Sequence, residues 1–193
     1  MELNNLNISA SPHIRSKETL TRIMWSVVIA LVPSGIWGVY AFGIHSLYAI
    51  LISVMTAVAT EAVIQKLRGK KITVFDGSAV ITGILLAYNL PPNVPLWIPF
   101  AGSFFAISIA KQAFGGIGFN IFNPALAGRA FLLAAWPAYM TKWTNPRWWP
   151  DAISSATPLA IVKNTEELAG QYLYHYSYRD LLLGNRSGCI GEV

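Results

Sequence analysis

Residues 47–65 read LYAILISVMTAVATEAVIQ and are followed at 66–71 by KLRGKK, so a long apolar run ends in a cluster of basic residues. A helix needs about 20 apolar residues to cross roughly 30 Å of hydrocarbon, and this run approaches that length. Positive residues in short loops stay on the cytoplasmic side of a membrane. The stretch therefore predicts a membrane-spanning helix whose cytoplasmic end carries Lys66, Arg68, Lys70 and Lys71.

The composition of the whole chain agrees with a membrane protein. Of its 193 residues, 54% are hydrophobic and only 12% are charged, which is too apolar for an ordinary soluble domain. The net charge is +5, but the basic residues lie beside hydrophobic runs instead of along one polar face, so nucleic-acid binding is not expected. The single cysteine, Cys189, excludes an internal disulfide, and the three histidines are too scattered to form a metal site. We therefore expect the lipid bilayer as a partner, and neither a metal nor a nucleic acid.

Further apolar runs predict helices that pack with the one at 47–65 into an all-α, polytopic bundle of about five membrane-spanning helices. These runs cover residues 20–42, 74–90, 96–113 and 122–139. Asp76 and Ser78 are good N-caps for the third helix, and Pro91 cannot continue it. The last three helices are short or interrupted by glycine and proline, which is typical of membrane helices that surround a buried ion or ligand.

The basic cluster also fixes the expected orientation. With residues 66–71 inside, the tail at 1–19 is cytoplasmic, and an odd number of crossings over 20–140 places everything from about Met140 onward outside. Residues 141–187 then form an extracytoplasmic loop, at whose start tryptophans gather as in an interfacial aromatic belt. Residues 188–193 read like the entry to another helix, so we expect the chain to be one half of a longer fold.

The most informative part of this external loop reads DAISSATPL over residues 151–159. By local physics alone, Thr157 is a good helix N-cap with Pro158 at the first helical position, and this structural explanation is sufficient for both residues. Together, however, Asp151, Ser154, Ala156 and Thr157 resemble the flavin-attachment signature shared by the D subunit of Rnf complexes and the B subunit of sodium-pumping NADH:quinone reductases. Ser155 stands where that signature commonly has glycine.

This resemblance implies a covalent cofactor on the external loop. In that family the threonine hydroxyl is joined to the phosphate of FMN by a phosphoester, which a flavin transferase installs from FAD. Carried over, Thr157 bears the FMN, and Asp151, Ser154, Ser155 and Ala156 belong to the acceptor motif. A helix that begins just beyond Thr157 would supply N–H groups and a positive dipole end for the remaining phosphate charge. The family's transferase acts on the outer side, where the basic loop independently places Thr157.

Other blocks of the chain resemble the same family, in the same order, and together they cover nearly the whole sequence. They are Ser11-Pro12-His13, Asp76-Gly77-Ser78-Ala79, Leu90-Pro91-Pro92, Lys111 to Gly118 and Phe122-Asn123-Pro124-Ala125. The resemblance implies an electron-transfer subunit, not catalytic alone, of a ferredoxin:NAD oxidoreductase that translocates Na⁺ or H⁺ across the bacterial cytoplasmic membrane. Its partners would be the other Rnf subunits and the flavin transferase. A noncovalent riboflavin is a second cofactor that the resemblance implies. The resemblance also implies that the longer fold is built from two repeats, of which this chain is one half.

Ionisable groups inside the expected membrane segments are the next candidates, because each costs several kcal/mol unless it is paired or wetted. Glu61, Asp76 and Arg129 meet this criterion. Glu61 and Asp76 lie near cytoplasmic helix ends, where interfacial solvation or capping explains them as well as a place in the cation path does. Arg129 has the donors to hold a carboxylate, a carbonyl or a flavin edge. Gly115 and Gly116 suit close helix packing, or a ligand role that the resemblance to quinone-reducing relatives suggests.

Two other functions fit the sequence. The B subunit of a sodium-pumping NADH:quinone reductase carries the same signature, but usually with a longer N-terminal extension before the block that starts here at Ser11. A cofactor-free transporter or channel subunit would also contain broken helices around a buried site. A covalent flavin on Thr157 separates both redox subunits from the transporter.

Overall fold

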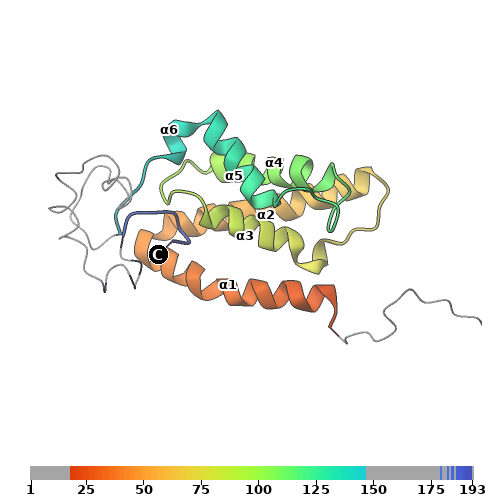
Figure 1. The fold of residues 1–193 in the computed structure, drawn as a ribbon, viewed down its shortest axis with the longest axis horizontal. Helices are drawn as coiled ribbons and strands as arrows, with labels where there is room; N and C mark the ends of the chain where they lie inside the picture. Colours follow the sequence, from red (N-terminus) through yellow and green to blue (C-terminus); the bar gives the residue numbers. More distant parts are fainter. Residues whose placement is uncertain (1–17, 147–178, 180–181, 183, 185, 193) are drawn as a thin grey trace, which may run out of the picture.

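The computed structural model describes residues 18–146, 179, 182, 184 and 186–192, and their regular structure is entirely helical. Figure 1 shows an elongated bundle with α1 along one side and α4 and α5 along the other. The elements are α1 (Leu20–Phe42), α2 (Ile44–Leu67), the 3₁₀-helix η1 (Val74–Asp76), α3 (Ser78–Tyr88), α4 (Trp97–Phe105), the π-helix η2 (Ala106–Gln112), α5 (Pro124–Ala135) and α6 (Pro137–Met140).

The first two helices form a tight antiparallel hairpin. Thr19 caps α1 by accepting a hydrogen bond from the backbone N–H of Arg22 at 3.3 Å. Gly43 alone separates α1 from α2, and its φ of 96° is a conformation that glycine adopts at little cost. The prediction for residues 20–42 is confirmed. The helix expected at 47–65 extends over Ile44–Leu67, because the chain re-enters a helix directly after Gly43.

The helix predicted for residues 74–90 is split at Gly77. This residue has a left-handed φ of 84°, so η1 ends before it and α3 starts after it. The N-cap of α3 is Gly77, so the expectation of Asp76 or Ser78 at that position was wrong; Asp76, directly before it, still accepts the backbone N–H of Ser78 on its Oδ1 at 2.8 Å. With 11 residues, α3 is about 17 Å long, roughly half the thickness of the hydrocarbon.

The last two predicted helices are also interrupted. The run at 96–113 is helical as expected, but its second half is the wider π-helix η2 instead of an α-helix. The run at 122–139 breaks at Trp136, so the prediction of one continuous helix to Tyr139 was wrong. Pro137 has no N–H to continue the α5 hydrogen-bond pattern, and it starts the short α6 instead. Asn123 and Pro124 open α5 as predicted, with Asn123 Oδ1 accepting from Ala125 N at 3.0 Å.

Two of the described helices, α1 and α2, are long and apolar enough to cross a bilayer by length and composition. The helices α3 and α5 are apolar but shorter. The expectation of an all-helical bundle in which some helices are short or broken is thus confirmed, while full crossings by the last three predicted helices are not seen in the described part of the chain.

Helix α2 lies at the centre of the bundle and contacts α1, α3, α4 and η2. Its buried face is built mostly from small residues, which let neighbouring backbones approach closely. A Cβ added at Gly83 of α3 would lie 2.7 Å from Val54 Cα, so these two backbones touch. Ser53 Oγ donates to Gly83 O at 2.8 Å and lies 2.7 Å from Ser103 Oγ, which ties α2 to both α3 and α4. The buried face comprises Ser46, Ala49, Ser53, Thr56, Ala57, Thr60, Glu61 and Gln65.

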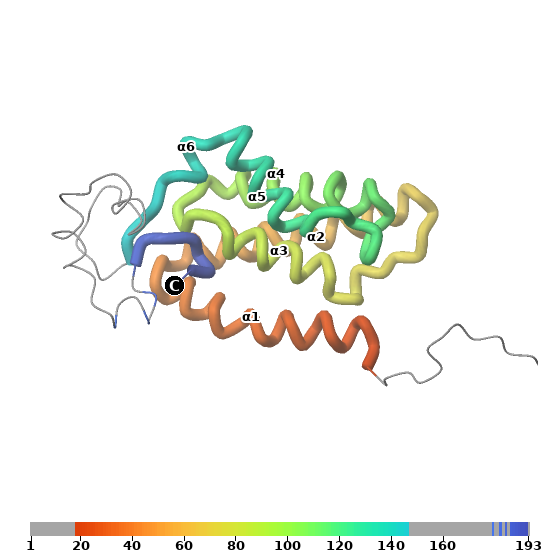
Figure 2. The backbone as a smooth tube through the Cα atoms, viewed as in Figure 1, coloured from red at the N-terminus to blue at the C-terminus, as the bar shows by residue number. Residues whose placement is uncertain are grey.

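The loops gather at two ends of the bundle (Figure 2). One end, here called the basic end, carries the start of α1, the loop 68–73 and the loop 113–123, and Trp25 Nε1 donates there to Phe75 O at 3.1 Å. The opposite end carries Gly43, the loop 89–96 and residues 186–192. There Ile190 N donates to Leu90 O at 3.1 Å and Gly191 N to Tyr88 O at 3.0 Å, so this last described segment packs on the end of α3.

Candidate functional site

A buried ion pair joins α2 to η2 near the basic end. Lys111 Nζ lies 2.8 Å from Glu61 Oε2, and the two residues are only 2% and 1% exposed. The other ion pair that the structure gives for residues 18–146, between Arg22 and Glu18, is largely exposed and lies within one stretch of chain. A charge inside a membrane helix is costly unless it is paired and hydrogen-bonded, and the Glu61–Lys111 pair meets both conditions.

Two side-chain amides hold the second oxygen of the Glu61 carboxylate. Gln112 Nε2 donates to Glu61 Oε1 at 2.7 Å, and Gln65 Nε2 donates to it at 3.2 Å. Gln65 is fixed in turn by Thr73, whose backbone N–H donates to Gln65 Oε1 at 2.8 Å. The carboxylate therefore has protein partners on both oxygens, and its orientation is set by α2, η2 and the loop after α2.

Ser78 connects the ion pair to a second carboxylate. Lys111 Nζ donates to Ser78 Oγ at 2.6 Å, and Ser78 Oγ donates to Asp76 Oδ1 at 2.7 Å. Glu61 and Asp76, which come from different helices, are thus the two ends of one chain of hydrogen bonds through Lys111 and Ser78. The same Asp76 oxygen also accepts the backbone N–H of Ser78, the first residue of α3, so Asp76 both holds the start of this helix and belongs to the charged network.

The wide turn of η2 presents Lys111 and Gln112 to this network. A π-helical segment adds a residue to the turn and occurs preferentially at functional sites, because it redirects side chains that an α-helix would place elsewhere. The C-terminal end of η2 is anchored by Arg68, whose Nη1 donates to Gln112 O. The network therefore draws on α2, the loop after it, η1, α3 and η2.

Two pockets adjoin the network. One, of about 340 Å³, is lined by Glu61, Asp76 and Gln112 from the network, by Gly115 and Gly116, and by other residues that include Lys70 and Lys71 of the basic loop. The other, of about 370 Å³, is lined by Lys111 and Ser78 and by residues of the loop 113–123, among them Gly118, Asn120 and Asn123. We call them the carboxylate pocket and the lysine pocket. Each partner of the ion pair thus lines a different pocket.

The glycines of the loop 113–123 serve a backbone role. Gly115, Gly116 and Gly118 have φ values of 120°, 102° and 86°, which side-chain-bearing residues rarely adopt. They form turns after η2 and do not bring two helices together, so the interpretation of Gly115 and Gly116 as helix-packing residues was wrong. Both line the carboxylate pocket, which keeps the ligand interpretation open.

Arg129 lies apart from the ion pair, in α5. Its Nη1 donates to Asn89 Oδ1 at 2.8 Å, and its Nη2 lies 3.9 Å from Cys189 Sγ. The Cys189 thiol also donates to Asn89 O at 3.4 Å. The sequence suggested a carboxylate, a carbonyl or a flavin edge as the partner of Arg129, and the partner in the fold is a carbonyl oxygen, that of the Asn89 side-chain amide. Arg129 links α5 to the end of α3 and to the last described segment, and it does not join the network around Glu61.

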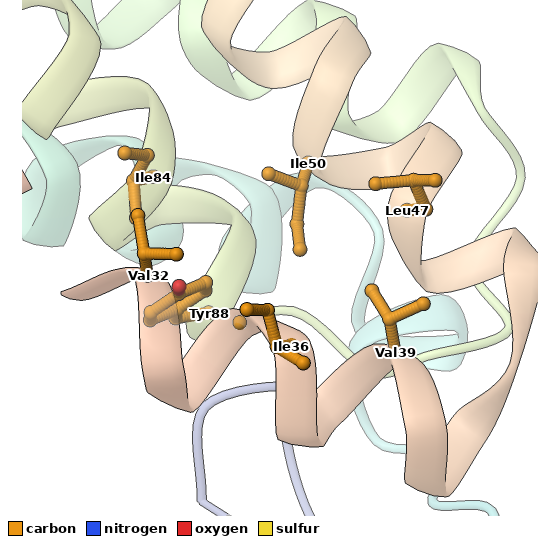
Figure 3. A pocket seen from close by; sticks show the side chains of 8 residues that line it. Val32, Ile36, Val39, Leu47, Ile50, Ile84 and Tyr88 are labelled. Atoms are coloured by element: carbon orange, nitrogen blue, oxygen red, sulfur yellow. The ribbon is translucent and has the colours of Figure 1, made fainter. Parts of the chain in front are cut away.

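A third hollow is purely apolar. Figure 3 shows aliphatic side chains of α1, α2 and α3 around a groove of about 340 Å³, with Tyr88 at one side. The Tyr88 hydroxyl donates to Leu31 O at 2.6 Å, so its polar atom is satisfied within the bundle. The groove offers no free polar side chain that could orient a ligand. It is therefore part of the surface of the bundle and not another polar site like the two pockets beside the charged network.

The structure therefore brings together four of the residues predicted as ion-path or ligand contacts, Glu61, Asp76, Gly115 and Gly116, and separates Arg129 from them. Thr157 and the motif residues Asp151, Ser154, Ser155 and Ala156 lie outside the described residues. Sequence reasoning missed Lys111 as a network member, because it named this residue only as the start of the block that ends at Gly118. A lysine in an apolar run, with a glutamate in another apolar run, was the signal that could have paired them.

Comparison with known proteins places this arrangement in a family. Residues 7–193 match the family described as NQR2, RnfD, RnfE. The chain is 52% identical to a protein named as the D subunit of a Na⁺-translocating ferredoxin:NAD⁺ oxidoreductase complex from Acetobacterium woodii, with 98% of the chain and 58% of the relative covered. It is 46% identical to the proton-translocating counterpart from Clostridium ljungdahlii, covering 98% of the chain and 59% of that relative. The chain thus spans less than two thirds of the length of these relatives. It belongs to the NQR2, RnfD, RnfE family of membrane proteins.

Proposed function

We propose that this chain is part of an electron-transfer subunit of an ion-translocating ferredoxin:NAD oxidoreductase, and that it works with the other subunits of an Rnf complex in the bacterial cytoplasmic membrane. The observation that carries the proposal is the family match over residues 7–193, a range that includes the attachment motif at 151–157. Relatives that are 52% and 46% identical are named as the D subunits of such complexes. Because those two names differ in the ion, Na⁺ and H⁺ both fit the similarity.

The proposed cofactor is FMN joined to Thr157 by a phosphoester. Such a bond requires an accessible hydroxyl, and the neighbouring Asp151, Ser154, Ser155 and Ala156 make up the motif that a flavin transferase would recognise. When bound, the flavin supplies the capacity to accept and pass on electrons. The described residues on the two sides of this loop lie together, since Ser187 Oγ donates to Asn145 Oδ1 at 2.7 Å.

The proposed orientation puts the basic end in the cytoplasm. The exposed Lys66, Arg68, Lys70 and Lys71 all lie at that end, and positive residues in short loops favour the cytoplasmic side. Asn145 and Ser187 lie beyond α6, toward the opposite end, which supports an extracytoplasmic Thr157.

The charged network supports a place on the ion path. Glu61 and Asp76 are the two carboxylates of the network, and they share the carboxylate pocket with Gly115 and Gly116. Carboxylates within the membrane part of a protein, adjoining a cavity, are the usual elements of proton and cation relays. We therefore assign Glu61 and Asp76, but not Arg129, to the translocation of the ion.

A noncovalent riboflavin is the second proposed cofactor, and we place it in the lysine pocket. Amides of Asn120 and Asn123 and hydroxyls of Ser78 and Thr82 line this pocket together with apolar side chains such as Met24. A flat heterocycle with polar edges needs this combination of apolar walls and a few hydrogen-bonding groups. Its volume of about 370 Å³ lies within the range of small-molecule sites.

In-gel fluorescence tests the covalent flavin. The protein is co-expressed with a flavin transferase, denatured, separated by electrophoresis and viewed under ultraviolet light. We expect a fluorescent band for the wild type and for Ser154→Ala, and a dark band for Thr157→Ala, because the hydroxyl of Thr157 forms the bond. A dark wild-type band would refute the covalent flavin and favour a cofactor-free transporter subunit. A fluorescent band is equally expected of the B subunit of a sodium-pumping NADH:quinone reductase. Activity assays with ferredoxin and with a quinone as the redox partner distinguish the two kinds of complex.

A further inference from the structure

The ammonium group of Lys111 occupies a position that suits a small cation. We propose that Lys111 is a built-in competitor for Na⁺ at Glu61: the lysine holds the carboxylate until Na⁺ arrives, and its ammonium group then moves toward Asp76. This inference rests on the proposed function in ion translocation, and it names the ion and the residue that controls its binding.

The atoms around Lys111 Nζ are those that a bound cation would need. Glu61 Oε2 lies 2.8 Å away and Ser78 Oγ lies 2.6 Å away, so the ammonium group sits between a carboxylate and a hydroxyl. Hard oxygen atoms of these kinds are the ligands that hard metal cations take in proteins. The charge and the oxygen partners of Nζ are therefore those that a bound Na⁺ would require.

The ion pair is poorly suited to a purely structural role. Removing two charges from water costs as much as or more than their attraction returns, and apolar residues of similar size often serve better for stability. The cost here is high because both side chains are almost fully buried. The arrangement suits a carboxylate whose positive partner can be exchanged, because the carboxylate then stays neutralised at every stage.

A second carboxylate, that of Asp76, lies within reach of the Lys111 ammonium group if the lysine side chain moves. Ser78 Oγ, which accepts a hydrogen bond from Nζ, itself donates to Asp76 Oδ1 at 2.7 Å. When Na⁺ neutralises Glu61, the ammonium group can pair with Asp76 instead. Each carboxylate then has one positive partner, so no unpaired charge is left in the bundle.

The carboxylate pocket gives a cation access to Glu61. Glu61 lines this pocket, whereas Lys111 lines the lysine pocket. A cation that enters the carboxylate pocket meets Glu61 without passing through the position of Lys111. The charged side chains that line that pocket with Glu61 are Asp76, Lys70 and Lys71, and the two lysines make entry dependent on ionic strength.

Thermal unfolding of the detergent-solubilised protein tests the exchange directly. NaCl is titrated against choline chloride at constant ionic strength, and the Na⁺ concentration that raises Tm by a fixed amount is measured, because a ligand that binds the folded state stabilises it in proportion to ln(1 + c/Kd), where c is the Na⁺ concentration. In Lys111→Met we expect this concentration to fall at least about tenfold, the factor expected for the loss of one close charge partner. Glu61→Gln should show no Na⁺-dependent rise. Lys66→Met, which removes an exposed lysine from the same basic end, should match the wild type.

If Lys111→Met needs the same Na⁺ concentration as the wild type, or if a Na⁺-dependent rise persists in Glu61→Gln, the proposal is overturned. Should Lys111→Met not fold, Lys111→Gln replaces it, since its amide can still donate to Glu61 while the charge is absent. This result can be distinguished from that of the flavin test. A dark gel band together with a lowered Na⁺ requirement in Lys111→Met refutes the flavin and retains the exchange, and a fluorescent band with an unchanged requirement does the reverse.

Discussion

The side chains of Glu61 and Lys111 lie 50 residues apart in the sequence and 2.8 Å apart in the fold. The sequence marked Glu61 and Asp76 as costly intramembrane groups, and the structure places both in one network. The sequence alone could not identify Lys111 as the link between them, because the position of its side chain depends on how η2 is rotated relative to α2. A lysine near a helix end satisfies the rule for cytoplasmic loops equally well, whether it faces water or a buried carboxylate.

Double-mutant cycles at this pair are expected to be strongly non-additive. In choline chloride, Lys111→Met should destabilise the protein by about 3–5 kcal/mol, because it leaves the buried Glu61 carboxylate without a counter-charge. Glu61→Gln combined with Lys111→Met should cost much less than the sum of the single changes. Unfolding in detergent measures all four proteins, and Lys70→Met is the exposed control. Additive effects would contradict the pairing.

The thiol of Cys189 should react slowly in the folded protein. Burial and the charge of Glu192 raise its pKa to about 12, and Arg129 opposes the rise. The thiolate is the reactive form, so the modification rate should increase by about tenfold per pH unit up to that pKa. Alkylation followed by mass spectrometry, in folded and denatured samples at pH 8, measures the difference. Equal rates in the two samples would show that the thiol is accessible and unperturbed.

Helix starts were more predictable than helix interiors. Asn123 caps α5 as the sequence indicated, since caps depend on local hydrogen bonds, whereas Gly77 takes the N-cap position of α3 that was expected for Asp76 or Ser78. The π-helical turn at Ala106–Gln112 and the break at Trp136 were not predicted. The first arises from the packing of η2 against α2, which no local pattern records. The second had a local signal in Pro137, which the hydrophobic run concealed.

The contact between α2 and α3 should not tolerate a side chain at Gly83. A Cβ there would meet Val54 Cα at 2.7 Å, and backbone cannot move aside as a flexible side chain can. We expect Gly83→Leu to lower stability by about 1–3 kcal/mol or more through overpacking. Ala30→Leu adds the same side chain at an exposed position of α1 and should leave the unfolding temperature almost unchanged. Similar temperatures for the two variants would argue against close packing of these helices.

At the scale of the whole molecule, hydropathy was sufficient to predict a helical membrane bundle with long and short helices. The two ends of that bundle differ in charge, with the exposed basic cluster at one end and the Asn145–Ser187 contact beyond α6, on the other side of the bundle. The order of the sequence motifs identified the family. Thr157 lies outside the described residues, so its assignment as the flavin attachment residue depends on the motif and on the described ends of the loop.

Cysteine labelling in intact cells tests the orientation. In a Cys189→Ser background, a cysteine at Asn145 should react with a membrane-impermeant maleimide added outside, because that residue lies on the extracytoplasmic side in the proposed topology. A cysteine at Gly69, beside the exposed basic residues, should react only after the cells are opened. Labelling of Gly69→Cys but not Asn145→Cys from outside would reverse the orientation.

Peptide mapping by mass spectrometry tests the central claim most directly. Protein co-expressed with the flavin transferase is purified, its intact mass is measured, and the modified peptide is sequenced. We predict a mass increase equal to one FMN less one water, confined to the peptide that contains Thr157 and located on that residue. An unmodified mass under these conditions, or FMN located on any other residue, would contradict the account.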